Sequence, residues 1–169
     1  MQRGDVDKAM QNFPLGNVEE AAYYLYVATL HQPEMAPPGM HSIKLECPTR
    51  LDSIGIDWDR DKDAIADTFI RRTEALIPGL RDHIVARRVF TPLDMVRRTH
   101  NNNGAFAGWA FVPQMLTRAR PQQRSPLPGL YLAGQWTNPV AGLPWVVRSG
   151  YNTAGMVLAD AGGHPQWKH

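Results

Sequence analysis

Hydrophobic and polar positions along this chain follow two periods, and the clearest pattern lies near the C-terminal end. Residues 130–133 form a short, continuous apolar run bounded by Gly129 and Gly134. Such a run is typical of a strand buried on both faces, as inside a parallel sheet. A turn-rich segment follows, and the pattern then predicts a helix from Pro144 to about Ala161, followed by two glycines.

The remaining pattern predicts further strands and amphipathic helices. Residues 23–28 are rich in aromatic and β-branched side chains, which favours a strand, although a helix stays open as an alternative. Residues 41–47 alternate between polar and apolar, and Cys47 falls on the apolar side as a small core residue. The full set of further elements comprises strands over 23–28, 41–47 and 84–90, helices over 61–77 and 92–99, and irregular chain over 1–12.

A strand, a glycine-containing turn and a helix start together form a corner that suits an anion. The N–H groups of Trp145, Val146 and Val147 are expected to be free at the helix start, where the helix dipole favours negative charge. Gly134 and Gly142 would let a ligand approach the backbone closely. A buried strand, turn and helix with no ligand is the alternative interpretation of the same pattern.

Composition adds limits rather than a function. The 169 residues are 43% hydrophobic and 20% charged with a net charge of +2, as in ordinary globular proteins. This charge gives no support to nucleic-acid binding. The single cysteine excludes an intrachain disulfide, and the sequence shows neither a membrane-spanning run nor a signal peptide. We therefore expect a cytoplasmic protein.

Metal and hydrolytic sites find little support in the sequence. The six histidines show no pair at metal-ligand spacing and no arrangement of a catalytic triad. Aspartates at positions 57, 59, 61 and 63 lack the glycine and the final glutamate of a calcium loop. We interpret these carboxylates as favourable charge at a helix start, and we expect no metal.

Several short motifs, in matching order from about residue 26 to 158, resemble one family. Near the C-terminus they are Gly129-Leu130-Tyr131-Leu132-Ala133-Gly134, Thr137, Pro139, Gly142, Pro144 and Ser149-Gly150. Upstream they are Ala36-Pro37-Pro38-Gly39-Met40-His41, Thr91-Pro92-Leu93-Asp94 and Arg120-Pro121. Together these motifs resemble phytoene desaturase and carotenoid isomerase-like flavoproteins of the amine oxidase superfamily.

The resemblance implies an α/β chain with mixed α+β character, the C-terminal portion of a two-domain FAD-dependent oxidoreductase. Residues 21–125 would supply part of the substrate-domain sheet with its helices. Residues 126–163 would supply the closing strand, turn and helix of the FAD-binding domain. A flexible lead-in over 1–20 and a tail over 164–169 complete this division.

The resemblance also implies which residues surround the cofactor and the substrate. The helix start would face the pyrimidine side of the flavin, where negative charge gathers on reduction. Trp109 and Trp136 would wall an apolar pocket, although core packing is the commoner use of such aromatic residues. No catalytic side chain is assigned. The expected flavin contacts are Gly134, Gln135, Gly142, Leu143, Pro144, Trp145 and Val146.

The implied reaction is hydride transfer or isomerisation at C–C bonds of a long apolar molecule, with a carotenoid or other isoprenoid as substrate. The chain departs from the family pattern at Val140 and Ala141, where glycines are usual, and at Trp145, where a small residue is usual. A tryptophan there would narrow the space over the flavin or wall the substrate pocket. The exact substrate therefore stays open.

One absence shapes the expected partners. No Gly-x-Gly-x-x-Gly motif occurs in the chain, so the part that would grip the FAD pyrophosphate is missing. We expect the chain to need an N-terminal FAD-binding half, or to associate with itself, through the small residues Gly150, Ala154 and Gly155. Peripheral contact with a membrane is compatible with an apolar substrate. The alternative is a non-catalytic remnant that serves protein association and does not bind FAD alone.

Overall fold

The computed structural model describes residues 6–109, 120–138 and 142–163. The chain divides into two compact units, residues 1–104 and residues 105–169. The predicted tail, Val140 and Ala141 lie outside the described residues. The domain boundaries expected at 20/21 and 125/126 stay predictions.

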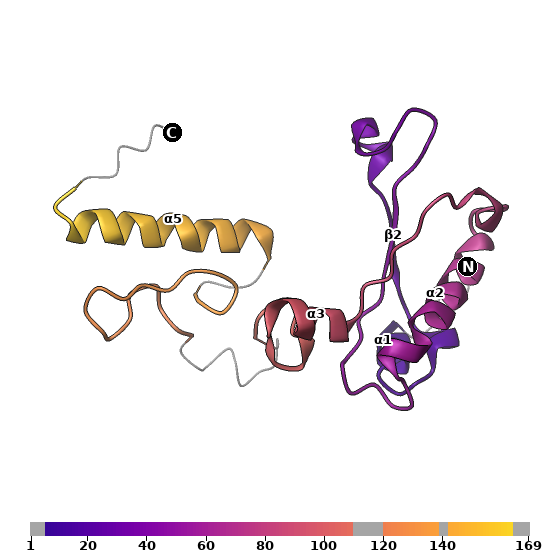
Figure 1. Ribbon diagram of the computed structural model, residues 1–169, viewed down its shortest axis with the longest axis horizontal. Coiled ribbons are helices and arrows are strands. Elements are labelled where there is room, and N and C mark those ends of the chain that lie inside the picture. Colours follow the sequence, from indigo (N-terminus) through magenta and orange to yellow (C-terminus); the bar gives the residue numbers. More distant parts are fainter. Residues whose placement is uncertain (1–5, 110–119, 139–141, 164–169) are drawn as a thin grey trace. The chain divides into compact units, whose positions relative to one another are not determined.

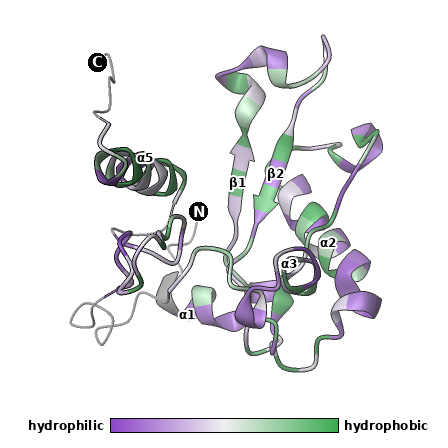
Figure 2. Cartoon of the chain, turned by 60° about the vertical axis from the view of Figure 1, so that its left-hand side comes forward, coloured by the Kyte–Doolittle hydropathy of each residue, from purple (hydrophilic) through white to green (hydrophobic). Residues whose placement is uncertain are grey.

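The N-terminal unit combines α-helices with an antiparallel hairpin (Figure 1). Its strands pair with Tyr24 opposite Glu46 and Val27 opposite Ile43. Exposed and half-buried side chains alternate along the first strand, as strand geometry requires, and hydrophobic residues lie on both strands (Figure 2). Both predicted strands are therefore confirmed. The elements in chain order are α1 (Val6–Asn12), β1 (Tyr24–Val27), β2 (Ile43–Glu46), α2 (Trp58–Glu74) and α3 (Pro92–Thr99).

A small aromatic core holds this unit together. Phe13 is 2% exposed, and its ring stacks on Trp58 and Phe69 with centroids 5.8 and 6.0 Å apart. Tyr23 packs against the same Phe69 ring at 5.2 Å. The interpretation of residues 1–12 as irregular is wrong for residues 6–12, because α1 forms there and leads directly into the buried Phe13.

The amphipathic helix predicted over 61–77 is confirmed as α2, with an earlier start and an earlier end. Its start is fixed by Asp57, whose carboxylate accepts two backbone N–H bonds at 3.1 and 3.2 Å. Asp59 and Asp61 follow in the first turn, where the helix dipole favours their charge. The interpretation of this acidic cluster as a helix start is therefore confirmed.

Helix α3 begins as the sequence predicts. The Thr91 hydroxyl accepts the Asp94 N–H at 3.2 Å, and the Asp94 carboxylate accepts the Thr91 N–H at 2.9 Å. This reciprocal pair is a capping box, and Pro92 occupies the first turn, where no N–H donor is needed.

The strand predicted over residues 84–90 is wrong. These residues have no regular secondary structure, and among the described residues the only strands are β1 and β2, which pair with each other. Val85 is 79% exposed, and Arg87 forms ion pairs with Asp63 and Asp67 of α2. An alternating pattern becomes a strand only beside a partner that accepts its backbone hydrogen bonds, and the pattern itself does not supply that partner.

The C-terminal unit is built around one long helix, α5 (Leu143–Asp160), which confirms the helix predicted from Pro144. Its end is closed by two bonds, from the Gly163 N–H to the Leu158 carbonyl at 2.8 Å and from the Gly162 N–H to the Ala159 carbonyl at 3.1 Å. This pair of bonds satisfies the last helical carbonyls, as the two glycines predict.

The strand predicted over residues 130–133 is wrong in this structure. Residues 120–138 form turns and irregular chain beside α5 (Figure 1), with one isolated bridge between Arg124 and Tyr131. Leu130 is exposed rather than buried on both faces. The physical reason is the same as for residues 84–90, since no described strand lies next to this segment to pair with it.

The fold class is mixed. The described residues contain four α-helices and one two-stranded antiparallel sheet. No parallel sheet is present in these ranges. The assignment of the two units to a substrate domain and an FAD-binding domain stays a prediction.

Candidate functional site

The glycine turn around Gly134 is attached to α5 by a buried hydroxyl. Ser149 is 1% exposed, and its Oγ accepts the Gly134 N–H at 2.8 Å and donates to the Val146 carbonyl at 2.8 Å. Four residues later, Thr153 Oγ1 lies 2.9 Å from the Leu132 carbonyl. Residues four apart share a helix face, so both hydroxyls hold the same segment against α5.

The turn is also closed from within. Thr137 is buried, and its N–H and its hydroxyl both donate to the Gly134 carbonyl, at 3.1 and 2.8 Å. The carbonyl of buried Gln123 accepts the Leu132 N–H at 2.7 Å, and the Gln123 amide donates to the Asn138 carbonyl. These bonds satisfy the polar groups of a segment that has no sheet around it.

A charged contact fixes the last turn of α5. The Asp160 carboxylate accepts bonds from the Arg124 guanidinium, one of them at 3.0 Å, and from the Tyr131 hydroxyl. The hydrogen bonds from Arg124 and Tyr131 lower the pKa of Asp160 to about 2. The same bond to Asp160 raises the pKa of Tyr131, because it stabilises the protonated phenol. The middle and the last turn of α5 are thus bonded to residues 124–134.

The helix start differs from the expectation in one respect. The N–H groups of Trp145 and Val146 both donate to the Gly142 carbonyl, at 3.0 and 2.9 Å, so the prediction that they are free is wrong. A tight first turn brings the carbonyl of Gly142 within reach of both donors. Pro144 has no N–H, so Leu143 is the one residue of this first turn whose N–H lacks an acceptor among the described residues.

The two glycines of the corner have backbones that other residues rarely adopt. Gly134 has φ 111° and Gly142 has φ 105°. A Cβ at Gly134 would meet no atom within 4 Å, and one at Gly142 would meet only Trp145 Cδ1, at 3.8 Å. The space beside both backbones is therefore open.

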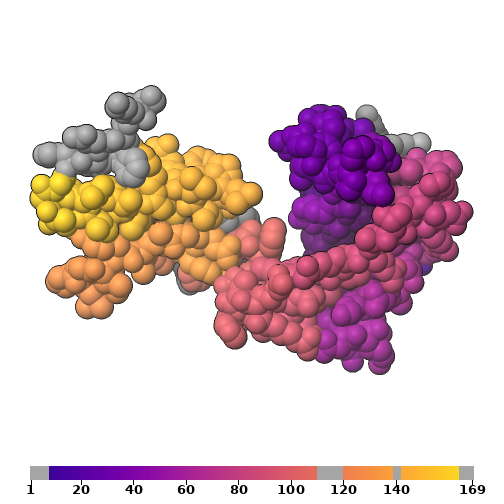
Figure 3. Space-filling model, turned by 45° about the horizontal axis from the view of Figure 1, so that its top comes forward, coloured from indigo at the N-terminus to yellow at the C-terminus, as the bar shows by residue number. Residues whose placement is uncertain are grey.

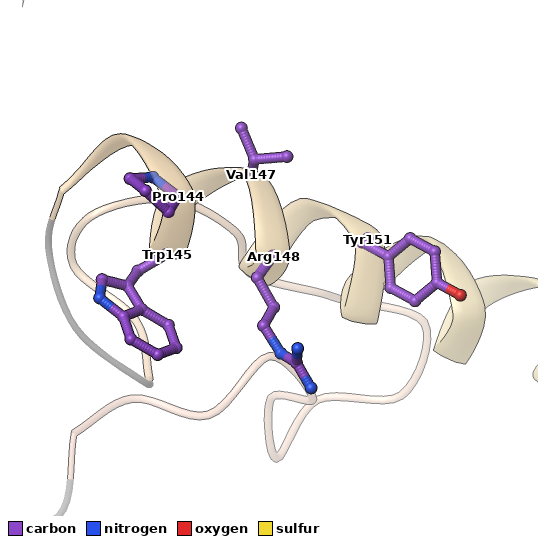
Figure 4. A pocket seen from close by; sticks show the side chains of 5 residues that line it. All are labelled: Pro144, Trp145, Val147, Arg148 and Tyr151. Carbon is purple, nitrogen blue, oxygen red and sulfur yellow. The ribbon is translucent and has the colours of Figure 1, made fainter. Parts of the chain in front are cut away.

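An open groove of about 720 Å³ lies along the first turns of α5. Its lining is Pro144, Trp145, Val147, Arg148 and Tyr151, and Figure 4 shows Trp145 and Arg148 extending to the same side of the helix. Only α5 contributes to this lining among the described residues, so the groove is a helix face rather than an enclosed cavity. Figure 3 shows α5 as an outer surface of its unit.

The two tryptophans expected in a substrate pocket lie together. The rings of Trp109 and Trp136 meet edge to face with centroids 5.3 Å apart, and Trp109 Nε1 donates to the Trp136 carbonyl at 3.0 Å. Trp109 and nearby Phe106 are exposed. The pair forms an aromatic surface in which the Trp109 N–H already has an acceptor.

The structure brings together some of the predicted site residues. Gly134 is bonded to α5, which itself begins after Gly142 and carries Leu143, Pro144, Trp145 and Val146. Gln135 is half-buried in the Gly134 turn. The sequence analysis did not foresee the roles of Ser149, Thr153 and Asp160. Polar residues four apart inside an apolar helix are a signal that would have identified the first two.

Other candidate chemistry finds no site in the described part of the chain. Burial raises the pKa of Cys47 to about 12, and this thiol packs against the aromatic core, which confirms it as a core residue. No three His, Cys, Asp or Glu side chains in the described ranges lie close enough to hold a metal ion. None of the described helices is both long and apolar enough to cross a bilayer.

The chain belongs to the family of flavin containing amine oxidoreductases, which it matches over residues 14–158. Among its relatives, phytoene desaturase (lycopene-forming) of Pseudescherichia vulneris is 34% identical over 149 residues, covering 84% of this chain and 30% of that protein. The enzyme of the same name from Paracoccus sp. is 36% identical, covering 84% of this chain and 29% of that protein. The predicted resemblance to phytoene desaturases is confirmed.

A third relative is named for a different substrate. The 4,4'-diapophytoene desaturase (4,4'-diaponeurosporene-forming) of Staphylococcus aureus strain MRSA252 is 30% identical over 161 residues, covering 86% of this chain and 32% of that protein. The chain thus spans about 30% of the length of the curated relatives it matches.

Proposed function

We propose that this chain is the C-terminal part of an FAD-dependent oxidoreductase that acts on a long apolar isoprenoid or carotenoid-like molecule. Family membership supports the class of cofactor, and the names of the relatives, phytoene and diapophytoene desaturases, support the class of substrate. The observation that carries the proposal is the open glycine corner, where Gly134 and Gly142 leave bare backbone beside the start of α5.

The residues of the corner fit one side of a flavin. The open space at Gly134 and Gly142 admits a flat ring close to the backbone. Trp145 and Leu143 offer exposed apolar surface, and the helix start places its positive dipole end at the same point. The corner offers little to a pyrophosphate, since Trp145 and Val146 already use their N–H groups.

When bound, FAD supplies a hydride acceptor, which is chemistry that no side chain can provide. In the proposal the flavin ring is held by the residues of the corner, which are Gly134, Gln135, Gly142, Leu143, Pro144, Trp145 and Val146. The hydroxyl of Ser149 keeps the Gly134 turn at a fixed position on α5, so it orients the corner without touching the cofactor. The helix start stabilises negative charge on the bound ring.

The aromatic pair would serve the substrate. Trp109 and Trp136 form an edge-to-face surface, and the Trp109 N–H donates to the Trp136 carbonyl, so this donor would keep its hydrogen bond beneath a polyene. Apolar contact excludes water from such a surface and positions a long molecule without a specific polar group. No side chain is proposed as a general base.

A chimera tests this proposal. In the phytoene desaturase of Pseudescherichia vulneris, the segment that this chain matches is replaced by residues 14–158 of this chain, and bound flavin and lycopene formation are measured. We expect the chimera to retain FAD through desalting and to form lycopene. The matched control carries Leu143→Asp, which places a charge at the predicted ring contact and should reduce bound flavin.

The outcomes separate the parts of the proposal. Bound flavin without lycopene would refute the phytoene-like substrate and keep the cofactor role. A folded chimera without flavin would refute the cofactor role and favour the alternative, a non-catalytic segment used for protein association. Equal amounts of bound flavin with and without Leu143→Asp would show that this helix start does not contact the flavin.

A further inference from the structure

An apolar stripe runs along the face of α5 that points away from Ser149 and Thr153. Leu143 is 83% exposed and Val147 is 69% exposed, and helical spacing continues the stripe through exposed residues further along. Hydrophobic colour follows much of this helix in Figure 2. Between the large residues lie the smaller Gly150 and Ala154, which leave room for close approach of another backbone. The exposed large members of the stripe are Leu143, Val147, Tyr151 and Leu158.

A single cation lies beside this stripe. Arg148 lines the same groove as Val147 and Tyr151, and none of the described carboxylates forms an ion pair with it. The other charged residue of α5, Asp160, is already bonded to Arg124. The surface is therefore apolar with one positive charge that no carboxylate of the described residues pairs with.

We propose that this face of α5 is a docking surface for a second polypeptide segment that is apolar and carries a carboxylate opposite Arg148. The inference rests on the proposed function, because the segment is assigned to the part of the flavoprotein that this chain does not span. The chain matches only about 30% of its relatives' length, so most of the protein that would surround α5 lies outside it. The charge of Arg148 selects an acidic rather than a neutral segment.

A second copy of this chain docked through its own α5 fits the surface less well. An α5–α5 pair would bring Arg148 near another apolar helix whose one carboxylate, Asp160, is held by Arg124 and Tyr131. The arginine would then be covered without a counter-charge, which is unfavourable. The segment from the remainder of the flavoprotein is thus the occupant to test.

The test uses the full 169-residue chain, co-expressed with the portion of the Pseudescherichia vulneris phytoene desaturase that it does not match. No flavin or substrate is added, so a failure of docking is distinguishable from a failure of the cofactor proposal. A Val147→Cys variant reports coverage by its rate of thiol labelling, read peptide by peptide. Because the pKa of Cys47 is about 12, the native thiol contributes a slow background.

We expect the thiol of the Val147→Cys variant to react freely in the chain alone and to react at least about tenfold more slowly in the complex. Arg148→Glu should weaken the complex by about thirtyfold, whereas Arg148→Lys should retain most of the affinity. Arg88→Glu, the same charge change at an exposed residue of the N-terminal unit, is the matched control and should leave the affinity within about threefold.

Four results would overturn the proposal. The first is that the wild-type chain forms no complex, and the second is that the Val147→Cys thiol is labelled at the same rate in the chain and in the complex. The third is that Arg148→Glu and Arg88→Glu weaken the complex equally. The fourth is that the Val147→Cys thiol becomes protected in the chain alone as its concentration rises. The last result would assign the surface to a second copy.

Discussion

Ser149→Ala removes the hydroxyl that holds the Gly134 turn on α5, and its cost follows from the contacts. The Val146 carbonyl loses a second donor but keeps the helical N–H four residues on, so this loss costs little. The Gly134 N–H loses its acceptor in a half-buried position. An unsatisfied buried donor costs about 1–3 kcal/mol, and because water has partial access to the Gly134 N–H, we expect a cost in the lower half of this range.

Helix propensity acts in the opposite direction. Alanine is the better helix former by roughly 0.5 kcal/mol, so the expected net loss is about 0.5–1.5 kcal/mol for the attachment of the turn. The upper end of that range corresponds to about tenfold in an equilibrium constant. We therefore expect amide hydrogen exchange at Gly134 to be about two- to tenfold faster in Ser149→Ala, with little change at the far end of α5.

The assay is residue-resolved hydrogen exchange by NMR, combined with urea unfolding. Asn152→Ala, on the same helix, is the control, because it raises helix propensity without removing a bond to the described Gly134 turn. Unchanged protection of Gly134 in Ser149→Ala would refute the view that this hydroxyl fixes the corner.

Three further predictions concern other parts of the chain. Phe13→Ala should lower the free energy of unfolding in urea by about 3–5 kcal/mol through the cavity it leaves, while Leu15→Ala, at an exposed position, should change it by less than about 0.5 kcal/mol. Equal effects of the two substitutions would contradict the assignment of Phe13 to the core. Thr91→Ala should cost about 1 kcal/mol by loss of the helix cap, and Thr91→Ser should recover most of it in the same assay. Since Arg124 lowers the pKa of Asp160 to about 2, this contact stabilises the folded state at pH values above 3.8, the ordinary pKa of the carboxyl group, and the stabilisation is lost as the pH falls toward 2. A titration midpoint of 3.8 for Asp160 in the folded protein, measured by NMR, would contradict this prediction.

The helices could be predicted from the sequence because their signals are local. Apolar spacing identified α2, the Thr91-Pro92 start identified α3, and the glycines after Ala161 identified the end of α5. A helix satisfies its own backbone within a few residues, so neighbouring side chains contain most of the information.

The errors arose where distant residues decide. Residues 84–90 and 130–133 have strand-like patterns, but a strand also needs a partner elsewhere in the chain. Residues 6–12 were interpreted as irregular because no local pattern reveals that the next residue, Phe13, stacks on Trp58 and Phe69. Burial of that ring is a tertiary effect that places the end of α1 next to the core.

For the candidate site, the role of the corner as a flavin contact stays a prediction. The glycines at 134 and 142 were chosen because they would let a ligand approach the backbone, and the space beside both is open. The free N–H groups expected at Trp145 and Val146 were wrong, because one carbonyl accepts from both. The bonds from Ser149 and Asp160 depend on which loop lies against α5, and one sequence contains no direct record of that.

The unpaired segment over residues 84–90 also has a consequence for the behaviour of the protein in solution. Apart from the Ile84 N–H, which donates to the Arg81 carbonyl at 3.4 Å, its backbone N–H and C=O groups form no backbone hydrogen bond within the described residues, so they are available to the same segment of another molecule. Arg87 and Arg88 place adjacent positive charges in this stretch, and side-by-side stacking of copies would bring those charges together. We therefore expect solubility at high concentration to depend on exposed Arg88 and on Arg87, which also ties this segment to α2 through Asp63 and Asp67.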